Sequence, residues 1–160
     1  MTPTVGGQLV TGSYAPGFSL PSTTGSMFTL SEHLGKHVIV YFFPAAMSPG
    51  CTTEALDFQD SLDALTPRGY LVVGVSMDPL EKLKRFAAQE KLPFPLLSDT
   101  TGAVARSYGA YGQTVSFGNK SRGIIRSTVV VGQEGRVEHA AYNVRATGHV
   151  AKLRRDLGLA

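Results

Sequence analysis

Runs of β-branched and aromatic residues alternate along the chain with stretches in which hydrophobic residues recur every three or four positions. Residues 38–43 and 71–76 are unalternating apolar runs, which is typical of strands covered on both faces. Residues 51–65 and 79–90 have helical spacing, with charged residues on the opposite side. The order strand, helix, strand, helix predicts an α/β layer protein.

Shorter elements are expected on either side of this centre. A Gly/Ser/Thr turn between residues 18–20 and 27–29 predicts an N-terminal β-hairpin. The segment Gly-Gln-Glu-Gly between residues 124–131 and 136–141 predicts a second hairpin near the C-terminus. The remaining expected elements are a strand at 95–98 and helices at 101–108 and 150–157. Together they predict a central mixed β-sheet flanked by helices.

The composition fits one globular domain. A chain of 160 residues with 42% hydrophobic and 17% charged residues is long enough for a single core and too apolar for a disordered protein. The first residues are polar and Gly-rich, so we expect a loose lead-in at 1–11 and one domain at 12–160. The N-terminus lacks a signal-peptide pattern and the longest apolar run is far shorter than a membrane span, so we expect a cytoplasmic protein.

Charge argues against a nucleic-acid partner. Lys and Arg number 15 against 12 Asp and Glu, a net charge of +3, without a run of like charges. Lys152, Arg154 and Arg155 surround Leu153, which predicts the solvated face of an amphipathic helix. None of the four histidines lies at a metal-ligand spacing from a carboxylate residue in the sequence. They are His33, His37, His139 and His149. We therefore expect no nucleic-acid or membrane partner, no metal and no cofactor.

Cys51 is the single cysteine of the chain, which excludes an internal disulfide, a Cys-x-x-Cys pair and a multi-cysteine zinc site. It follows a buried strand and a Pro/Gly-rich loop, at the predicted start of a helix. Ser48 is a good N-cap and Pro49 suits the first helical position, which places Cys51 at about the third. The free amide groups and the dipole of the first turn favour a thiolate there.

A helix terminus alone does not ionise a thiol. A thiol with a pKa near 8.5 is only about 3% ionised at pH 7, and lowering that pKa by about 2.5 takes roughly 3.4 kcal/mol. A helix terminus supplies about 0.3–2 kcal/mol, so a second positive group is needed. Arg126 is a candidate, because a charge inside the predicted apolar strand 124–131 is costly to bury unless it is paired. The alternative interpretation of Cys51 is a small buried hydrophobic residue.

A known family pattern covers this region. The spacing Pro44-x-x-x-Ser48-x-x-Cys51 matches the peroxiredoxin pattern Pro-x-x-x-Thr/Ser-x-x-Cys. Further matches follow in order: Gly74-Val75-Ser76-x-Asp78, Leu92-Pro93-Phe94-Pro95-Leu96-Leu97-Ser98-Asp99, Tyr108-Gly109 and Arg126-Ser127-Thr128. From about residue 12 to 157 the chain resembles the Q-type peroxiredoxins, the bacterioferritin comigratory proteins.

The resemblance implies a thioredoxin-like fold and an antioxidant thiol peroxidase for hydrogen peroxide and alkyl hydroperoxides. Cys51 would be the peroxidatic nucleophile, whose thiolate is oxidised to a sulfenic acid. Ser48 would hydrogen-bond the peroxide, and Arg126 would stabilise the charge that develops as the O–O bond lengthens.

Three further residues would support this site. Pro44 would shield the sulfur from water, the backbone N–H groups of Gly50 and Cys51 would complete the pocket, and Glu54 would orient Arg126. Simpler interpretations stay open for each side chain. They are a helix cap alone for Ser48, which is compatible with peroxide contact, a strand terminator alone for Pro44 and a first-turn helix charge alone for Glu54.

The chain departs from the family at three positions. Ser48 replaces the commoner Thr, which keeps the hydroxyl but loses the methyl that fixes its rotamer. Leu56 stands where many Q-type proteins have a second cysteine, which implies a one-cysteine cycle recycled from outside. The reductant would be a low-molecular-weight thiol, a thioredoxin- or glutaredoxin-like protein, or a second copy of Cys51, so a monomer and a homodimer both stay open. Gln59 stands where the branch often has Arg, and we assign it no role.

Three functions are weighed. The first is a one-cysteine peroxidase, which we favour. The second is a redox sensor or relay, in which Cys51 passes its oxidation to a partner protein through a mixed disulfide. The third is a non-redox binding module that uses the basic C-terminal face, which the small net charge disfavours.

Overall fold

The fold is described from a computed structural model, which covers residues 7–116 and 118–159. A five-stranded sheet with the order β5-β4-β3-β8-β9 forms its centre. Its strands are β3 (His37–Phe42), β4 (Tyr70–Ser76), β5 (Leu96–Ser98), β8 (Ser127–Val131) and β9 (Val137–Ala141). The first three are parallel and the last two antiparallel to their neighbours, so the predicted mixed sheet is confirmed.

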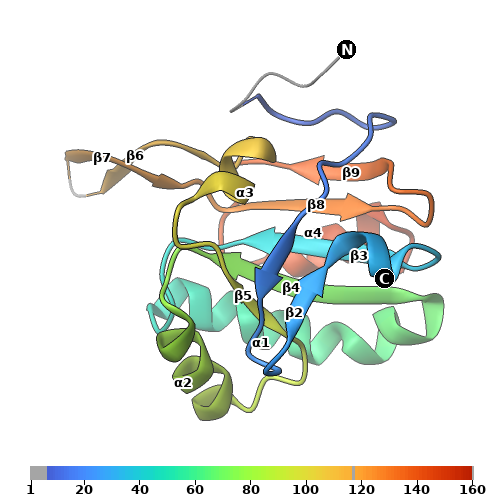
Figure 1. Cartoon of the computed structure of the whole chain (residues 1–160), viewed down its shortest axis with the longest axis horizontal. Coiled ribbons are helices and arrows are strands. Elements are labelled where there is room, and N and C mark those ends of the chain that lie inside the picture. Colours follow the sequence, from blue (N-terminus) through green and yellow to red (C-terminus); the bar gives the residue numbers. More distant parts are fainter. Residues whose placement is uncertain (1–6, 117, 160) are drawn as a thin grey trace.

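Helices and two hairpins surround this sheet. The helices are α1 (Pro49–Leu65), α2 (Leu80–Glu90), α3 (Ala103–Ser107) and α4 (His149–Asp156), with short 3-10 turns η1 (Leu30–His33) and η2 (Thr66–Arg68). The hairpins are β1 (Ser19–Pro21) with β2 (Met27–Thr29), and β6 (Tyr111–Ser116) with β7 (Asn119–Ile124). Figure 1 shows the first hairpin in front of the sheet and α4 behind it.

The central strand β3 divides the core in two. Val38, Val40 and Phe42 pack with the N-terminal hairpin and α3, whereas Ile39 and Tyr41 pack with α1, α2 and α4. All five side chains are at most 2% exposed. This burial on both faces explains why the strand is an unbroken apolar run.

The predicted strand 124–131 is wrong at its beginning, because the chain breaks there. Ile124 ends β7 and Ser127 begins β8, so Arg126 lies in the short connection and not inside a strand. The N–H of Val144 donates to the carbonyl of Arg126 at 3.0 Å, which fixes this connection. The break lets the guanidinium leave the sheet and avoids burying a charge between strands.

The hairpin β6–β7 was not predicted. Its strands are polar and glycine-containing, as in Tyr111-Gly112-Gln113-Thr114, and they lack the alternation that marks a half-buried strand. Figure 1 shows it projecting from the edge of the molecule. Its strands pair with each other in a separate two-stranded sheet. Because they are not part of the central sheet, they need no hydrophobic face to pack against the core.

The N-terminal segment contributes to the core. Leu9 is buried with Leu20 and Phe28, and its N–H donates to the hydroxyl of Tyr142 at 2.8 Å. The segment expected to be loose, 1–11, therefore includes a packed residue, and its residues 1–6 lie outside the described part of the chain.

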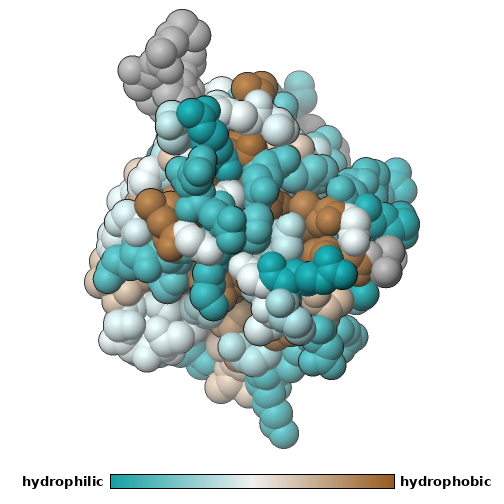
Figure 2. Space-filling model, turned by 90° about the vertical axis from the view of Figure 1, so that its right-hand side faces the viewer, coloured by the Kyte–Doolittle hydropathy of each residue, from teal (hydrophilic) through white to brown (hydrophobic). Residues whose placement is uncertain are grey.

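The surface seen from the right-hand side of Figure 1 is mostly polar. Figure 2 shows hydrophobic residues there in small separate patches among hydrophilic ones, as on ordinary water-exposed protein surfaces. Within residues 7–116 and 118–159, no helix is long and apolar enough to cross a membrane. In the same ranges, no group of three or more His, Cys, Asp or Glu residues is placed to hold a metal ion.

Candidate active site

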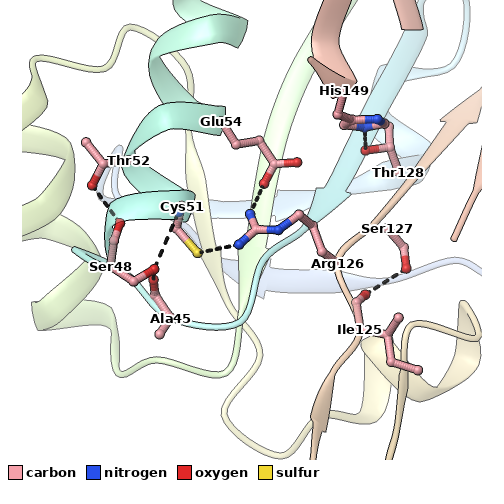
Figure 3. Close-up of polar contacts among 10 residues, drawn as sticks. All are labelled: Ala45, Ser48, Cys51, Thr52, Glu54, Ile125, Arg126, Ser127, Thr128 and His149. Atoms are coloured by element: carbon pink, nitrogen blue, oxygen red, sulfur yellow. Dashed lines mark hydrogen bonds and ion pairs between the residues drawn. The ribbon is translucent and has the colours of Figure 1, made fainter. Parts of the chain in front are cut away.

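Cys51 lies in the first turn of α1, at the end of the sheet where the parallel strands finish. Ser48 caps the helix and Pro49 is its first residue, so Cys51 is the third, as predicted. The Ser48 hydroxyl donates to the carbonyl of Ala45 at 2.9 Å and accepts the N–H of Cys51 at 3.4 Å. Thr52 donates its hydroxyl to the carbonyl of Ser48 at 2.9 Å, and Figure 3 shows these contacts. The cap therefore fixes the turn that carries the sulfur.

Arg126 joins Cys51 and Glu54. One guanidinium nitrogen, Nη2, lies 3.5 Å from Cys51 Sγ, and the other, Nη1, donates to Glu54 Oε1 at 2.6 Å (Figure 3). Cys51 is 1% exposed and the Glu54 side chain is fully buried, whereas the Arg126 side chain is 15% exposed. A permanently charged guanidinium thus faces the sulfur in a site whose side chains are largely shielded from solvent.

Glu54 is a buried carboxyl group with only one of its oxygens satisfied. Its Oε2 has no hydrogen-bond partner among the described residues. Burial raises the pKa of Glu54 to about 7, and Asp57 also raises it, while the charge and hydrogen bond of Arg126 pull it down. Near neutral pH this carboxyl group is therefore partly protonated.

The raised pKa predicts a pH-dependent stability. Between pH 4.5 and 7 the unfolded chain loses the Glu54 proton while the folded chain keeps it, so folding becomes weaker as pH rises through this window. We expect the unfolding free energy of the wild type, relative to Glu54→Gln, to fall by about 3 kcal/mol over this window. Denaturant titrations at a series of pH values measure the difference.

The control is Glu81→Gln, because the Glu81 side chain is 80% exposed. Parallel pH profiles for wild type and Glu54→Gln would contradict the prediction.

Gly50 borders the site at Arg126, and Pro44 lies in the loop that leads to α1. A Cβ atom on Gly50 would lie 3.2 Å from Arg126 Nη2, so the absence of a side chain lets the guanidinium come close to the helix. Pro44 lies two residues beyond the end of β3 and is exposed. The N–H of Cys51, expected to face the peroxide, is engaged by Ser48 over a long 3.4 Å contact.

Asp78 is a residue near the site to which the sequence analysis assigned no role. It follows β4, and its Oδ2 accepts the backbone N–H of Ala46 at 2.8 Å and the hydroxyl of Ser76 at 2.8 Å. Ala46 belongs to the loop between β3 and α1 that leads to Ser48. The available signal was its position, since functional side chains of α/β proteins lie beyond the carboxyl ends of strands.

His149, for which the sequence predicts no metal site, is buried. It is 7% exposed, and its Nε2 lies 2.7 Å from the hydroxyl of Thr128. Burial lowers the pKa of His149 to about 4, so the ring is neutral at physiological pH. The hydrogen bond to buried Thr128 and the packing of its ring edge-on against Phe58, with the ring centroids 6.4 Å apart, hold it inward.

Sequence comparisons place these residues in a family. The chain matches the AhpC/TSA family over residues 11–140. It is 49% identical over 152 residues to a Mycobacterium tuberculosis protein named as peroxiredoxin Rv2521. The matched region covers 95% of this chain and 97% of that protein. It is 39% identical over 141 residues to peroxiredoxin Bcp of Escherichia coli, with 88% of this chain and 90% of that protein covered.

Solved structures show the same fold. Peroxiredoxin Q of Xanthomonas campestris matches with a TM-score of 0.83 and 33% identity, over 88% of this chain and 90% of that chain. BcpB of Mycobacterium tuberculosis matches with a TM-score of 0.80 and 33% identity, over 92% and 96%. Another Xanthomonas campestris structure, of a bacterioferritin comigratory protein with alkyl peroxide reduction activity, has a TM-score of 0.82 and 33% identity, over 88% of this chain and 90% of that chain. The expected thioredoxin-like fold is confirmed, and the chain belongs to the AhpC/TSA family as a peroxiredoxin of the Bcp/PrxQ branch, an antioxidant thiol-dependent peroxidase.

Proposed function

We propose that this peroxiredoxin works by a one-cysteine mechanism on hydrogen peroxide and organic hydroperoxides and is recycled by an external thiol. The observation that carries the proposal is the contact of Arg126 with both Cys51 and Glu54 in a chain that has a single cysteine. The alkyl peroxide reduction activity of the similar Xanthomonas campestris protein supports the organic substrates.

The hydrogen bonds of Ser48 suggest how a peroxide binds. A hydroxyl group has one donor and two acceptor positions. The Ser48 proton points to Ala45 and one lone pair accepts from Cys51, which leaves one lone pair for the O–H of the peroxide. Ser48 would therefore accept a hydrogen bond from the substrate while Arg126 donates one to it.

The chemical step follows from this arrangement. The Cys51 thiolate attacks the peroxide oxygen that carries the proton, an S–O bond forms and the O–O bond breaks. The electron pair of the broken bond leaves with the second oxygen, which takes from solvent the proton that the thiol lost on ionising and departs as water or an alcohol. The sulfur is oxidised by two electrons to a sulfenic acid, and Arg126 stabilises the negative charge on the leaving oxygen. Gly50 gives the guanidinium room, Glu54 orients it, and Pro44 shields the sulfur from water.

Recycling needs two thiol molecules. The first condenses with the sulfenic acid, which releases water and leaves a mixed disulfide on Cys51. The second attacks that disulfide, which returns the Cys51 thiol and releases the oxidised reductant. Leu56 has no thiol to replace either molecule. Because Cys51 is 1% exposed, a low-molecular-weight thiol meets less steric obstruction than a protein. The same burial disfavours the protein relay and a disulfide between two copies of Cys51.

Intact-mass spectrometry of the reduced protein tests the proposal. One equivalent of hydrogen peroxide is added first, and a panel of low-molecular-weight and protein thiols follows. We expect the rapid gain of one oxygen atom at Cys51, and the return to the reduced mass when a suitable thiol is added. A Cys51 that stays unmodified for minutes would overturn the proposed chemistry. A mixed disulfide between Cys51 and a partner protein that accumulates with little peroxide turnover would favour the relay.

A further inference from the structure

The loop between β3 and α1 is held in a costly conformation. Met47 has a φ of +69°, in the left-handed region that residues other than glycine rarely adopt. Such a conformation persists only where the surrounding structure fixes it. Ala46, the residue before Met47, is 3% exposed and faces the loop that follows β4.

Asp78 is the group that holds this loop. Its Oδ2 accepts the N–H of Ala46 at 2.8 Å, and the side chain is 11% exposed. Three neighbours hold Asp78 in turn. The Ser76 hydroxyl donates to Oδ2 at 2.8 Å, Lys82 Nζ lies 3.2 Å from Oδ1, and the Ser98 hydroxyl donates to the Asp78 carbonyl at 2.7 Å.

One peptide group connects Asp78 to Ser48. The N–H of Ala46 and the carbonyl of Ala45 belong to the same planar peptide unit, which does not twist easily. Its N–H donates to Asp78, and its carbonyl accepts the hydroxyl of Ser48 at 2.9 Å.

We propose that Asp78 is a positioning residue of the peroxidase reaction, which acts through the Ala45–Ala46 peptide to direct the Ser48 hydroxyl. With its proton held on Ala45, Ser48 presents a free lone pair to the O–H of the peroxide. This inference rests on the proposed role of Ser48. Asp78 itself touches neither the sulfur nor the substrate.

Two substitutions of Asp78 distinguish its role as a hydrogen-bond acceptor from its negative charge. Asp78→Ala removes the acceptor for Ala46, and we expect the second-order rate constant for Cys51 oxidation by hydrogen peroxide to fall about tenfold, because small misplacements of a reacting group are costly. Asp78→Asn keeps an oxygen that can accept the N–H, and we expect its rate constant within about twofold of the wild type. Stopped-flow peroxide kinetics on protein shown to be folded measure both. A rate constant for Asp78→Ala equal to that of the wild type, or an equal loss in Asp78→Asn, would overturn the proposal.

Asp99 supplies a matched control for stability. Like Asp78 it follows a parallel strand and accepts two hydrogen bonds, from the N–H groups of Val104 and Ala105 at 3.3 and 2.9 Å. Asp99→Ala should lower the unfolding midpoint and leave the oxidation rate of the folded protein unchanged. If it slows oxidation as much as Asp78→Ala does, the effect of Asp78 is on stability alone and the proposal fails.

Two further measurements keep the outcome decisive. If Asp78→Ala does not fold, Ser76→Ala is measured instead. It removes the hydroxyl that holds Asp78 Oδ2 but leaves the Asp78 carboxylate itself in place. A smaller loss of rate in the same direction is then expected, and none would overturn the inference. Cys51→Ser in the same assay tests the proposed function separately. Peroxide consumption that survives in Cys51→Ser refutes that function, whereas fast wild-type oxidation with an equally fast Asp78→Ala refutes only the role of Asp78.

Discussion

The Cys51→Ser variant is expected to consume hydrogen peroxide no faster than buffer, at any concentration of added thiol. A serine hydroxyl stays protonated at neutral pH, whereas the thiolate is the nucleophilic form of cysteine. The chain has no second cysteine to take over the reaction. Peroxide consumption coupled to thiol oxidation measures the loss.

The fold should survive this substitution. Serine is close in size to cysteine, and Arg126, which lies 3.5 Å from the sulfur, offers a hydrogen bond to the new hydroxyl. Circular dichroism and an unfolding curve close to those of the wild type would show that activity, not structure, was lost. Catalytic turnover that persists in folded Cys51→Ser would refute the assignment of Cys51 as the nucleophile.

Much of the fold could be predicted because the local signals and the tertiary packing agree. The run at 38–43 is hydrophobic on both faces because β3 lies between two cores. The Ser48-Pro49 pair marks the start of α1 because capping depends only on nearby residues. The break at Ile125-Arg126 was missed, since it depends on contacts with distant segments such as Val144.

The site also has a part that local sequence predicts and a part that depends on contacts between distant residues. Local sequence placed Cys51 beside its helix cap, but Arg126 and Glu54 are 72 residues apart. Only the family resemblance brought that pair together. Asp78 matched the family pattern without showing a role, because its contact with Ala46 is between a side chain and a backbone 32 residues away. Such contacts leave no periodicity in the sequence.

The Arg126→Met variant is expected to lower the rate constant for Cys51 oxidation about 10²–10³-fold. Methionine fills similar space but removes the charged donor that faces both the sulfur and the leaving oxygen, and a loss of this size is usual for such a group. Stopped-flow kinetics with hydrogen peroxide measure it. Arg122→Met is the matched control, because Arg122 is exposed and lies over the ring of Tyr111. A loss in Arg122→Met equal to that in Arg126→Met would show a general effect of charge.

A second substitution separates the chemistry of Arg126 from its effect on folding. Without the guanidinium, Glu54 is left buried with neither oxygen paired to a charge, so Arg126→Met should also destabilise the fold. Adding Glu54→Gln removes the carboxylate and should restore much of the stability. It should not restore the rate, because the donor facing Cys51 is still missing. Recovery of the rate in the double variant would mean that Arg126 serves only to neutralise Glu54, and that the thiolate needs no cation.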